Sequence, residues 1–225
     1  MVNNYNWDYM DKLEDAVRLI LQSPNFGHDF QHHKDVWGLA KRIDEGEGVE
    51  VDMEVVYAGC MFHDTGYAFL DPDDPKQVHH PERSKKCAQD ILPQVGFPNE
   101  KIEAVLEAIL LHDDTKPFMR GRETPTEKRE IWYLQDADSI LGLGAIGIAR
   151  IIEYCTNAHT PLYVPSLSFD DVDSGKKSAI HNVYRHAVEV YQRLHTKTAK
   201  EMVKEKSEYM INFVKMFVEE SKITH

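Results

Sequence analysis

The sequence predicts an all-α protein, and three observations carry this prediction. Apolar residues recur at the three- and four-residue spacing of an amphipathic helix along most of the 225 residues. No stretch shows the alternation of β-branched and polar residues that is typical of a half-buried strand. Segments rich in Pro, Gly and Asp, such as residues 46–48 and 71–75, interrupt the helical pattern. We therefore expect one compact helical domain over residues 1–225.

The periodic stretches predict nine helices in chain order. Two of their starts carry capping signals, Thr124 followed by Pro125 and Glu127, and Thr198 followed by Glu201. The expected helices cover about residues 7–22, 30–45, 51–64, 79–95, 99–113, 125–140, 143–156, 177–194 and 198–221.

The C-terminal third of the chain contains a long connection and a long helix. Residues 159–175 hold two prolines and are expected to be irregular, either as a lid or as a surface crossing. The final helix carries Ala199, Val203, Met210 and Phe217 on one stripe. This stripe favours packing onto the domain over self-association.

Two of the first three helices carry polar residues on apolar faces. His32 shares its helix face with Val36, whereas the direction of its neighbour His33 is ambiguous. The helix expected over about 51–64 is apolar along its length and ends on His63 and Asp64. An aspartate at the inner end of an apolar helix needs a cation, a donor network or a metal, because burying an unpaired carboxylate is costly.

Three later helices repeat this arrangement. His80 leads a stripe of small and apolar residues and points inward, while His79 points outward. His112 ends the apolar stripe of the helix over about 99–113. Asp138 and Asp136 both fall on buried sides of the next helix, and Asp138 has the purer apolar stripe. Each of these groups alone is more often a hydrogen-bonded core residue than a ligand.

Taken together, the inward polar residues predict a metal site. Two imidazoles and two carboxylates would neutralise a divalent cation. Mixed nitrogen and oxygen ligation without a thiolate suits manganese, iron, cobalt, nickel or a catalytic zinc better than a closed structural zinc site. A metal explains the buried aspartates most economically.

Composition restricts the partners of the protein. The formal net charge of -12 would repel nucleic acids and anionic membranes, which leaves a small molecule or a protein. The three cysteines lie far apart and predict neither a disulfide framework nor a thiolate zinc site. The N-terminus shows neither a basic nor an apolar signal region, so we expect a cytoplasmic protein. A second copy of the chain, in a homodimer, is a further candidate partner.

Six stretches of the chain match one known family: HDFQHHKDVWGLAKRI, CMFHDTGY, HHPERSKKCAQDIL, IEAVLEAILLHDD, LQDADSILGLGAIGIARI and SAIHNVYRHAVEVYQRLHTKTAKEMVKEKSEYM. Through them the chain resembles the HD-domain superfamily of helical, metal-dependent phosphohydrolases, and the resemblance covers nearly the whole chain. The chain is similar in particular to a bacterial subgroup that includes manganese-dependent nucleoside triphosphate pyrophosphohydrolases.

The resemblance implies a role for each inward polar residue. It implies a metal-binding core over about residues 25–150 and a C-terminal helical part over about 176–222. His80 and His112 match histidines that hold a second metal or contact the phosphate. From its place beside an open metal position, our own hypothesis is that Asp64 also orients the attacking water. The implied metal ligands are His32, His63, Asp64 and Asp138. Manganese is the favoured ion, with iron, cobalt, nickel, zinc or magnesium as alternatives.

Three residues depart from the family pattern next to these positions. Asp35 stands where the family commonly has arginine, and Ser139 and Leu141 interrupt its D-A-D-R-L-D run. These departures put the substrate contacts in question. Lys197 and Lys200 are candidates to meet a phosphate tail, although a solvated basic face is the more common reason for such a pair.

The expected function is hydrolysis of a phosphate ester or anhydride in a small nucleotide. The leading hypothesis is that the protein is a (deoxy)nucleoside triphosphate pyrophosphohydrolase. The alternatives are an HD phosphatase or phosphodiesterase on another phosphorylated metabolite, and a related enzyme of non-phosphate hydration or di-iron oxygenation. A non-catalytic metal- or nucleotide-binding sensor is the remaining alternative.

Overall fold

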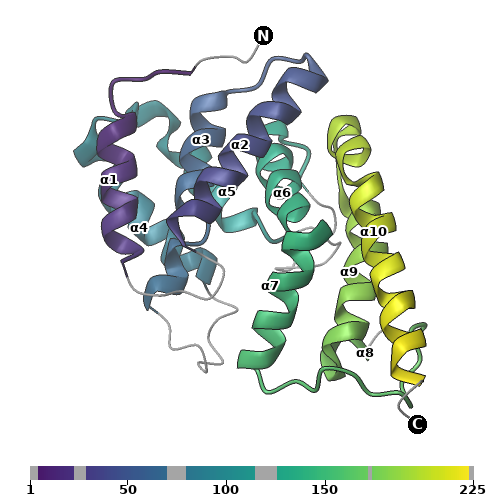
Figure 1. Cartoon of the computed structure of the whole chain (residues 1–225). Coiled ribbons are helices and arrows are strands. Elements are labelled where there is room, and N and C mark those ends of the chain that lie inside the picture. The colour runs from purple at the N-terminus through teal and green to yellow at the C-terminus, as the bar shows by residue number, and fades with distance from the viewer. Residues whose placement is uncertain (1–4, 23–28, 70–79, 115–125, 172–173, 223–225) are drawn as a thin grey trace. The chain divides into compact units, whose positions relative to one another are not determined.

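The computed structural model describes residues 5–22, 29–69, 80–114, 126–171 and 174–222, and every regular element in these ranges is a helix (Figure 1). This confirms the predicted all-α class for the described residues. The chain divides into two compact units, Met1–Asp138 and Ser139–His225. The single domain expected over residues 1–225 stays a prediction.

The first unit is built around one short helix that is apolar along most of its length. Apart from Glu54, every residue of α3 is buried, and α3 packs against α1, α2, α4 and α5. A Cβ on Gly59 would lie 3.2 Å from Leu134 and 3.7 Å from Ala108, so the missing side chain permits close packing. The elements of this unit are α1 (Met10–Ile20), α2 (Phe30–Glu47), α3 (Met53–Phe62), η1 (Thr65–Phe69), α4 (His80–Val95), η3 (Asn99–Lys101), α5 (Ile102–Leu111) and α6 (Arg129–Leu141) up to Asp138.

Side-chain caps fix where the two central helices begin. The Asp29 carboxylate accepts a hydrogen bond from the His32 amide at 2.9 Å and caps α2. The Asp52 carboxylate accepts from the amides of Glu54 and Val55 and caps α3. The cap on α2 therefore places His32 in the first turn of its helix.

Aromatic side chains hold the N-terminal segment against α2 and α3. The rings of Trp37 on α2 and Tyr57 on α3 meet edge to face with centroids 5.2 Å apart. Trp7 packs on both, at 6.3 Å from Trp37 and 5.7 Å from Tyr57. Aromatic pairs of this kind contribute about 0.5–1.5 kcal/mol each beyond their burial, so they stiffen the contact between α2 and α3.

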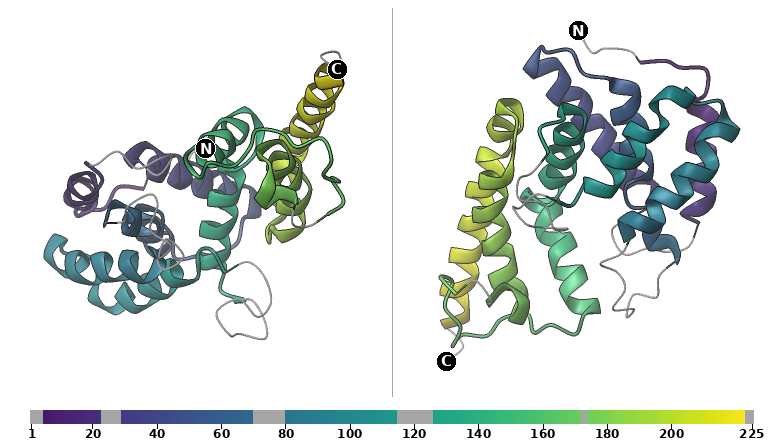
Figure 2. Two further views of the ribbon diagram at one scale, coloured as in Figure 1. Left: turned by 90° about the horizontal axis from the view of Figure 1, so that it is seen from below. Right: turned by 180° about the vertical axis from the view of Figure 1, so that it is seen from behind.

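The second unit contains three long helices that pack on one another. They are α7 (Gly144–Asn157), α9 (Ala179–Arg193) and α10 (Lys197–Lys222), with the short α8 (Ser174–Lys177) before α9. In both Figure 1 and Figure 2, α9 and α10 run side by side. Ala199, Val203 and Met210 are buried, so the predicted stripe of the last helix packs within this unit.

Several local expectations need correction. The short helix α8 begins inside residues 159–175, which were expected to be irregular. The cap of α10 is Thr196, whose hydroxyl accepts from the Ala199 amide at 3.2 Å, and not Thr198, because the helix already begins at Lys197. The helix expected from residue 125 begins at Arg129. Thr124, Pro125 and His79 lie outside the described residues.

Two further observations concern cysteines and membrane segments. All three cysteines are free, and Cys60 and Cys155 are buried while Cys87 is half-buried. Within the described ranges, no single helix has the length and apolar character needed to cross a membrane. Among the described helices one bent pair, α6 and α7, meets the length and composition criterion when the two helices are taken together.

Candidate metal centre

The polar residues that helical periodicity directs inward lie at helix ends of the first unit. His32 is in the first turn of α2, His80 is the first residue of α4, and Asp138 is in the last turn of α6. His63, followed by Asp64, caps the C-terminus of α3, and His112 caps that of α5. Because α3 packs against α5 and α2, these ends meet inside one unit.

The first group of converging side chains is the predicted metal-ligand set. Its four members are His32, His63, Asp64 and Asp138, and their ligand atoms lie within 4.8 Å of one another. The Nε2 atoms of His32 and His63 are 3.1 Å apart. The Asp64 Oδ2 atom lies 3.4 Å from the first and 3.3 Å from the second, and Asp138 Oδ1 lies 3.5 Å from His32 Nε2.

The second group shares Asp64 with the first. Its other oxygen, Oδ1, lies 3.1 Å from His80 Nε2 and 3.2 Å from His112 Nε2. The two imidazole nitrogens are themselves 3.1 Å apart. Asp64 therefore presents one carboxylate oxygen to each group, and it is the residue that both groups have in common.

Backbone carbonyls fix the orientation of two of the histidine rings. His63 Nδ1 lies 2.9 Å from the Cys60 carbonyl oxygen, and His112 Nδ1 lies 2.7 Å from the Ile109 carbonyl oxygen. Each carbonyl belongs to the last turn of the preceding helix, where carbonyl groups need partners from outside the helical ladder. A carbonyl can only accept, so Nδ1 carries the hydrogen and a lone pair remains on Nε2 of each neutral ring.

This tautomer makes the centre suited to a cation. In their neutral forms His63 and His112 direct the Nε2 lone pair at a second ring nitrogen and at an oxygen of Asp64, and acceptors at about 3 Å repel one another unless a proton or a metal ion lies between them. An outer hydrogen bond from Nδ1 to a carbonyl is also the usual support of a metal-bound histidine. The donor set therefore fits a divalent metal.

The pKa values of His112 and His32 also reflect the two carboxylates of the centre. Burial alone would lower the pKa of His112, but its hydrogen bond to Asp64 and the charge of that carboxylate outweigh burial and raise the pKa to about 9. At His32 burial prevails over the nearby carboxylates and lowers the pKa to about 4. Thus the second group holds a proton at neutral pH, whereas His32 offers a neutral imidazole.

The two aspartates of α6 differ from the expectation. Asp136 is almost fully buried at 1% exposure, whereas 32% of the Asp138 side chain is exposed. Asp138, which was expected on the purer apolar stripe, thus borders the solvent side of the first group. Helical periodicity gives the direction of a side chain but not the depth of the surface there.

A turn after α3 brings His80 next to Asp64. A Cβ on Gly66 would lie 2.2 Å from the His80 carbonyl oxygen, so only glycine permits this approach. The Gly66 amide also donates to the Ser84 hydroxyl at 2.8 Å. The ring of Tyr67 stacks on His80 with centroids 4.2 Å apart. Sequence reasoning missed Tyr67 because it lies in a 3-10 turn, where the spacing of an α-helix no longer applies.

The two lysines proposed from sequence lie in the second unit. Lys197 is exposed and pairs with Glu201 at 3.6 Å, one helical turn away, and Lys200 is half-buried. An exposed ion pair of this type is common on helix surfaces. Their contact with a substrate stays a prediction.

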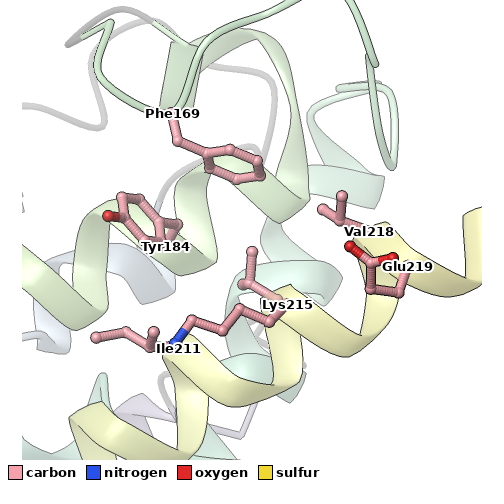
Figure 3. Close-up of a pocket in the computed structure, with 7 residues that line it drawn as sticks. Phe169, Tyr184, Ile211, Lys215, Val218 and Glu219 are labelled. Atoms are coloured by element: carbon pink, nitrogen blue, oxygen red, sulfur yellow. The ribbon is translucent and has the colours of Figure 1, made fainter.

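A cavity of about 220 Å³ is found in the second unit (Figure 3). Phe169 and Tyr184 lie on one side of it, and Ile211, Lys215 and Glu219 of α10 lie on the other. Its lining is mainly apolar and has one ammonium and one carboxylate group. It therefore lacks the converging imidazoles that mark the candidate metal centre.

An all-helical fold with this centre defines a helical histidine–aspartate metal-binding domain. The model of the HD domain matches residues 29–142, just over half of the chain, and the chain belongs to this family. The matched segment contains every member of both groups.

Relatives match over nearly the whole length of the chain. The uncharacterized protein YpgQ of Bacillus subtilis is 26% identical over 208 residues, which cover 91% of this chain and 90% of YpgQ. The crystal structure of YpgQ in complex with ADP has a TM-score of 0.64 at 25% identity and covers 92% of this chain and 97% of that one.

Two more distant structures share the fold. A protein from Lactobacillus plantarum has a TM-score of 0.72 at 20% identity and covers 98% of this chain and 100% of its own. An HD-superfamily hydrolase from Bacillus thuringiensis has a TM-score of 0.67 at 22% identity and covers 95% of this chain and 98% of its own.

Proposed function

We propose that the protein is a metal-dependent phosphohydrolase of small nucleotides, with (deoxy)nucleoside triphosphates as the leading substrates and pyrophosphate as a product. The observation that carries this proposal is the convergence of four imidazole Nε2 atoms on the two oxygens of Asp64. Membership of the HD family supports hydrolysis, and the ADP complex of YpgQ supports a nucleotide as ligand.

His32, His63, Asp64 and Asp138 would hold one divalent ion, with manganese favoured and iron, cobalt, nickel, zinc or magnesium as alternatives. A bound ion of this kind lowers the pKa of a coordinated water and polarises a phosphoryl oxygen. The partly exposed Asp138 marks the side of the group that solvent reaches.

The residues of the second group have roles that follow from their charge. Asp64 presents one carboxylate oxygen to each group and would orient the attacking water. His112 carries a proton at neutral pH in the metal-free centre and would, with His80, donate to the phosphoryl oxygens as negative charge develops there. A second cation held by Asp64, His80 and His112 would supply the same positive charge in place of that proton.

The test is hydrolysis of a panel of deoxy- and ribonucleoside tri-, di- and monophosphates, with and without Mn²⁺, using Asp64→Ala as the blank. We expect release of pyrophosphate from triphosphates that requires the metal and falls by about 10³-fold or more in Asp64→Ala, since this residue belongs to both groups.

The products separate the proposal from its alternatives. Release of orthophosphate, or opening of a cyclic nucleotide, would favour a phosphatase or a phosphodiesterase on the same centre. Mn²⁺ binding without turnover of any nucleotide on the panel would contradict the proposal and favour a sensor or a non-nucleotide substrate.

A further inference from the structure

His33 is a buried histidine next to the first group whose role the proposed mechanism does not use. Its side chain has 0% exposure, and its Nδ1 lies 3.0 Å from the carbonyl oxygen of Cys60. The same oxygen lies 2.9 Å from Nδ1 of His63. A carbonyl oxygen has two lone pairs, and here two imidazole N–H groups occupy both.

The two hydrogen bonds to this carbonyl differ in origin. The bond from His63 is local, because His63 follows Cys60 by three residues. The bond from His33 comes from α2 and spans 27 residues of sequence. The second bond therefore ties the last turn of α3 to the first turns of α2.

This tie closes a ring of contacts around the first group. His33 directly follows His32 in the sequence, and His32 Nε2 lies 3.1 Å from Nε2 of His63. The rings of His33 and His63 are 4.8 Å apart between centroids. The hydrogen bond from His33 thus restricts the distance between α2 and α3 where they supply the imidazoles of His32 and His63.

The environment of His33 Nε2 indicates that this ring lowers the stability of the fold. Its Nε2 is buried and has no hydrogen-bond partner among the described residues. A buried polar atom without a partner lowers the stability of the fold, so an apolar side chain would fill this place at a lower cost. The carbonyl oxygen of Cys60 can only accept, so Nδ1 of His33 is the donor of this hydrogen bond.

We propose that His33 is a positioning residue, which holds His63 and His32 at metal-binding distance by sharing the Cys60 carbonyl oxygen with His63. The inference rests on the proposed metal-binding function of the first group. His33 itself directs its N–H at the carbonyl and belongs to neither of the two ligand groups.

The experiment measures Mn²⁺ affinity by the electron paramagnetic resonance signal of the free ion. In His33→Leu the donor is lost and the site stays filled, and we expect affinity to fall 10–100-fold, the range typical of an outer partner of a metal-bound histidine. In His33→Asn the side-chain amide occupies the place of Nδ1, and we expect most of the affinity to return. His181→Leu removes an equally buried histidine from the second unit and is the matched control.

The outcomes distinguish the two proposals. Wild-type protein that binds no Mn²⁺ overturns the proposed function and this inference with it. Wild-type binding that is unchanged in folded His33→Leu overturns the inference alone. Equal weakening in His33→Leu and His33→Asn also overturns it, because packing and not the shared carbonyl would then explain the loss. Circular dichroism and thermal unfolding verify that each variant is folded.

Discussion

His63 in the first unit and His181 in the second are both buried histidines, yet their ring nitrogens face different partners. His181 Nδ1 lies 2.9 Å from the Ser178 hydroxyl, and its Nε2 lies 3.2 Å from the Leu167 carbonyl oxygen. His63 Nδ1 also has a carbonyl partner, but its Nε2 lone pair faces another ring nitrogen and the Asp64 carboxylate. Burial alone therefore does not indicate a site, whereas convergent acceptors do.

The neighbours of the two histidines extend this contrast. In the second unit Asn182 donates to the Cys155 sulfur at 3.6 Å and accepts from Arg185 at 3.0 Å, so this network pairs donors with acceptors. In the first unit two groups of imidazoles and carboxylates gather around Asp64. Both ring nitrogens of His181 are therefore satisfied without a ligand, whereas the groups around Asp64 call for a cation.

The largest expected effect comes from removing one imidazole in each unit. His32→Ala deletes one of four ligands, and we expect Mn²⁺ affinity to fall by about 10³-fold, beyond the 10–100-fold loss typical of outer partners. His181→Ala should leave Mn²⁺ affinity unchanged. Isothermal titration calorimetry with Mn²⁺ measures both. Equal losses in the two variants would contradict the distinction between the units.

Helical periodicity predicted much of the first unit because it reports the direction of a side chain. It placed His32, His80 and His112 inside, and all three are buried. It did not predict that Asp64 gives one oxygen to each group, since that arrangement depends on which helix ends meet. The depth of Asp138 and the role of His33 depend equally on neighbouring helices.

The next effect is an acid sensitivity that belongs to the first unit. Burial, only partly offset by nearby carboxylates, lowers the pKa of His32 to about 4 from an ordinary value of about 6.5. Its contribution to the stability of the metal-free protein is therefore present above pH 6.5. It is lost as the pH falls toward 4, where protonation favours the unfolded chain. The loss is on the order of 3 kcal/mol between pH 7 and pH 4.

Urea unfolding of the metal-free protein at a series of pH values measures this loss. His32→Asn cannot take up the proton, and we expect its free energy of unfolding to fall less steeply over the same interval. Identical slopes in wild type and His32→Asn would show that other groups cause the acid sensitivity.

The smallest effect tests whether the second unit can be weakened without disturbing the metal centre. Thr196 is buried at 3% exposure, and its hydroxyl accepts from the Ala199 amide at the start of α10. Loss of such a cap costs about 1 kcal/mol, so Thr196→Ala should lower the free energy of unfolding by that amount, while Thr196→Ser keeps the acceptor and most of the stability. We expect Mn²⁺ affinity to be the same in both variants, since the two ligand groups lie wholly in the first unit. A fall in Mn²⁺ affinity in Thr196→Ala would show that α10 supports the centre, and the two units would then have to be treated as one functional body.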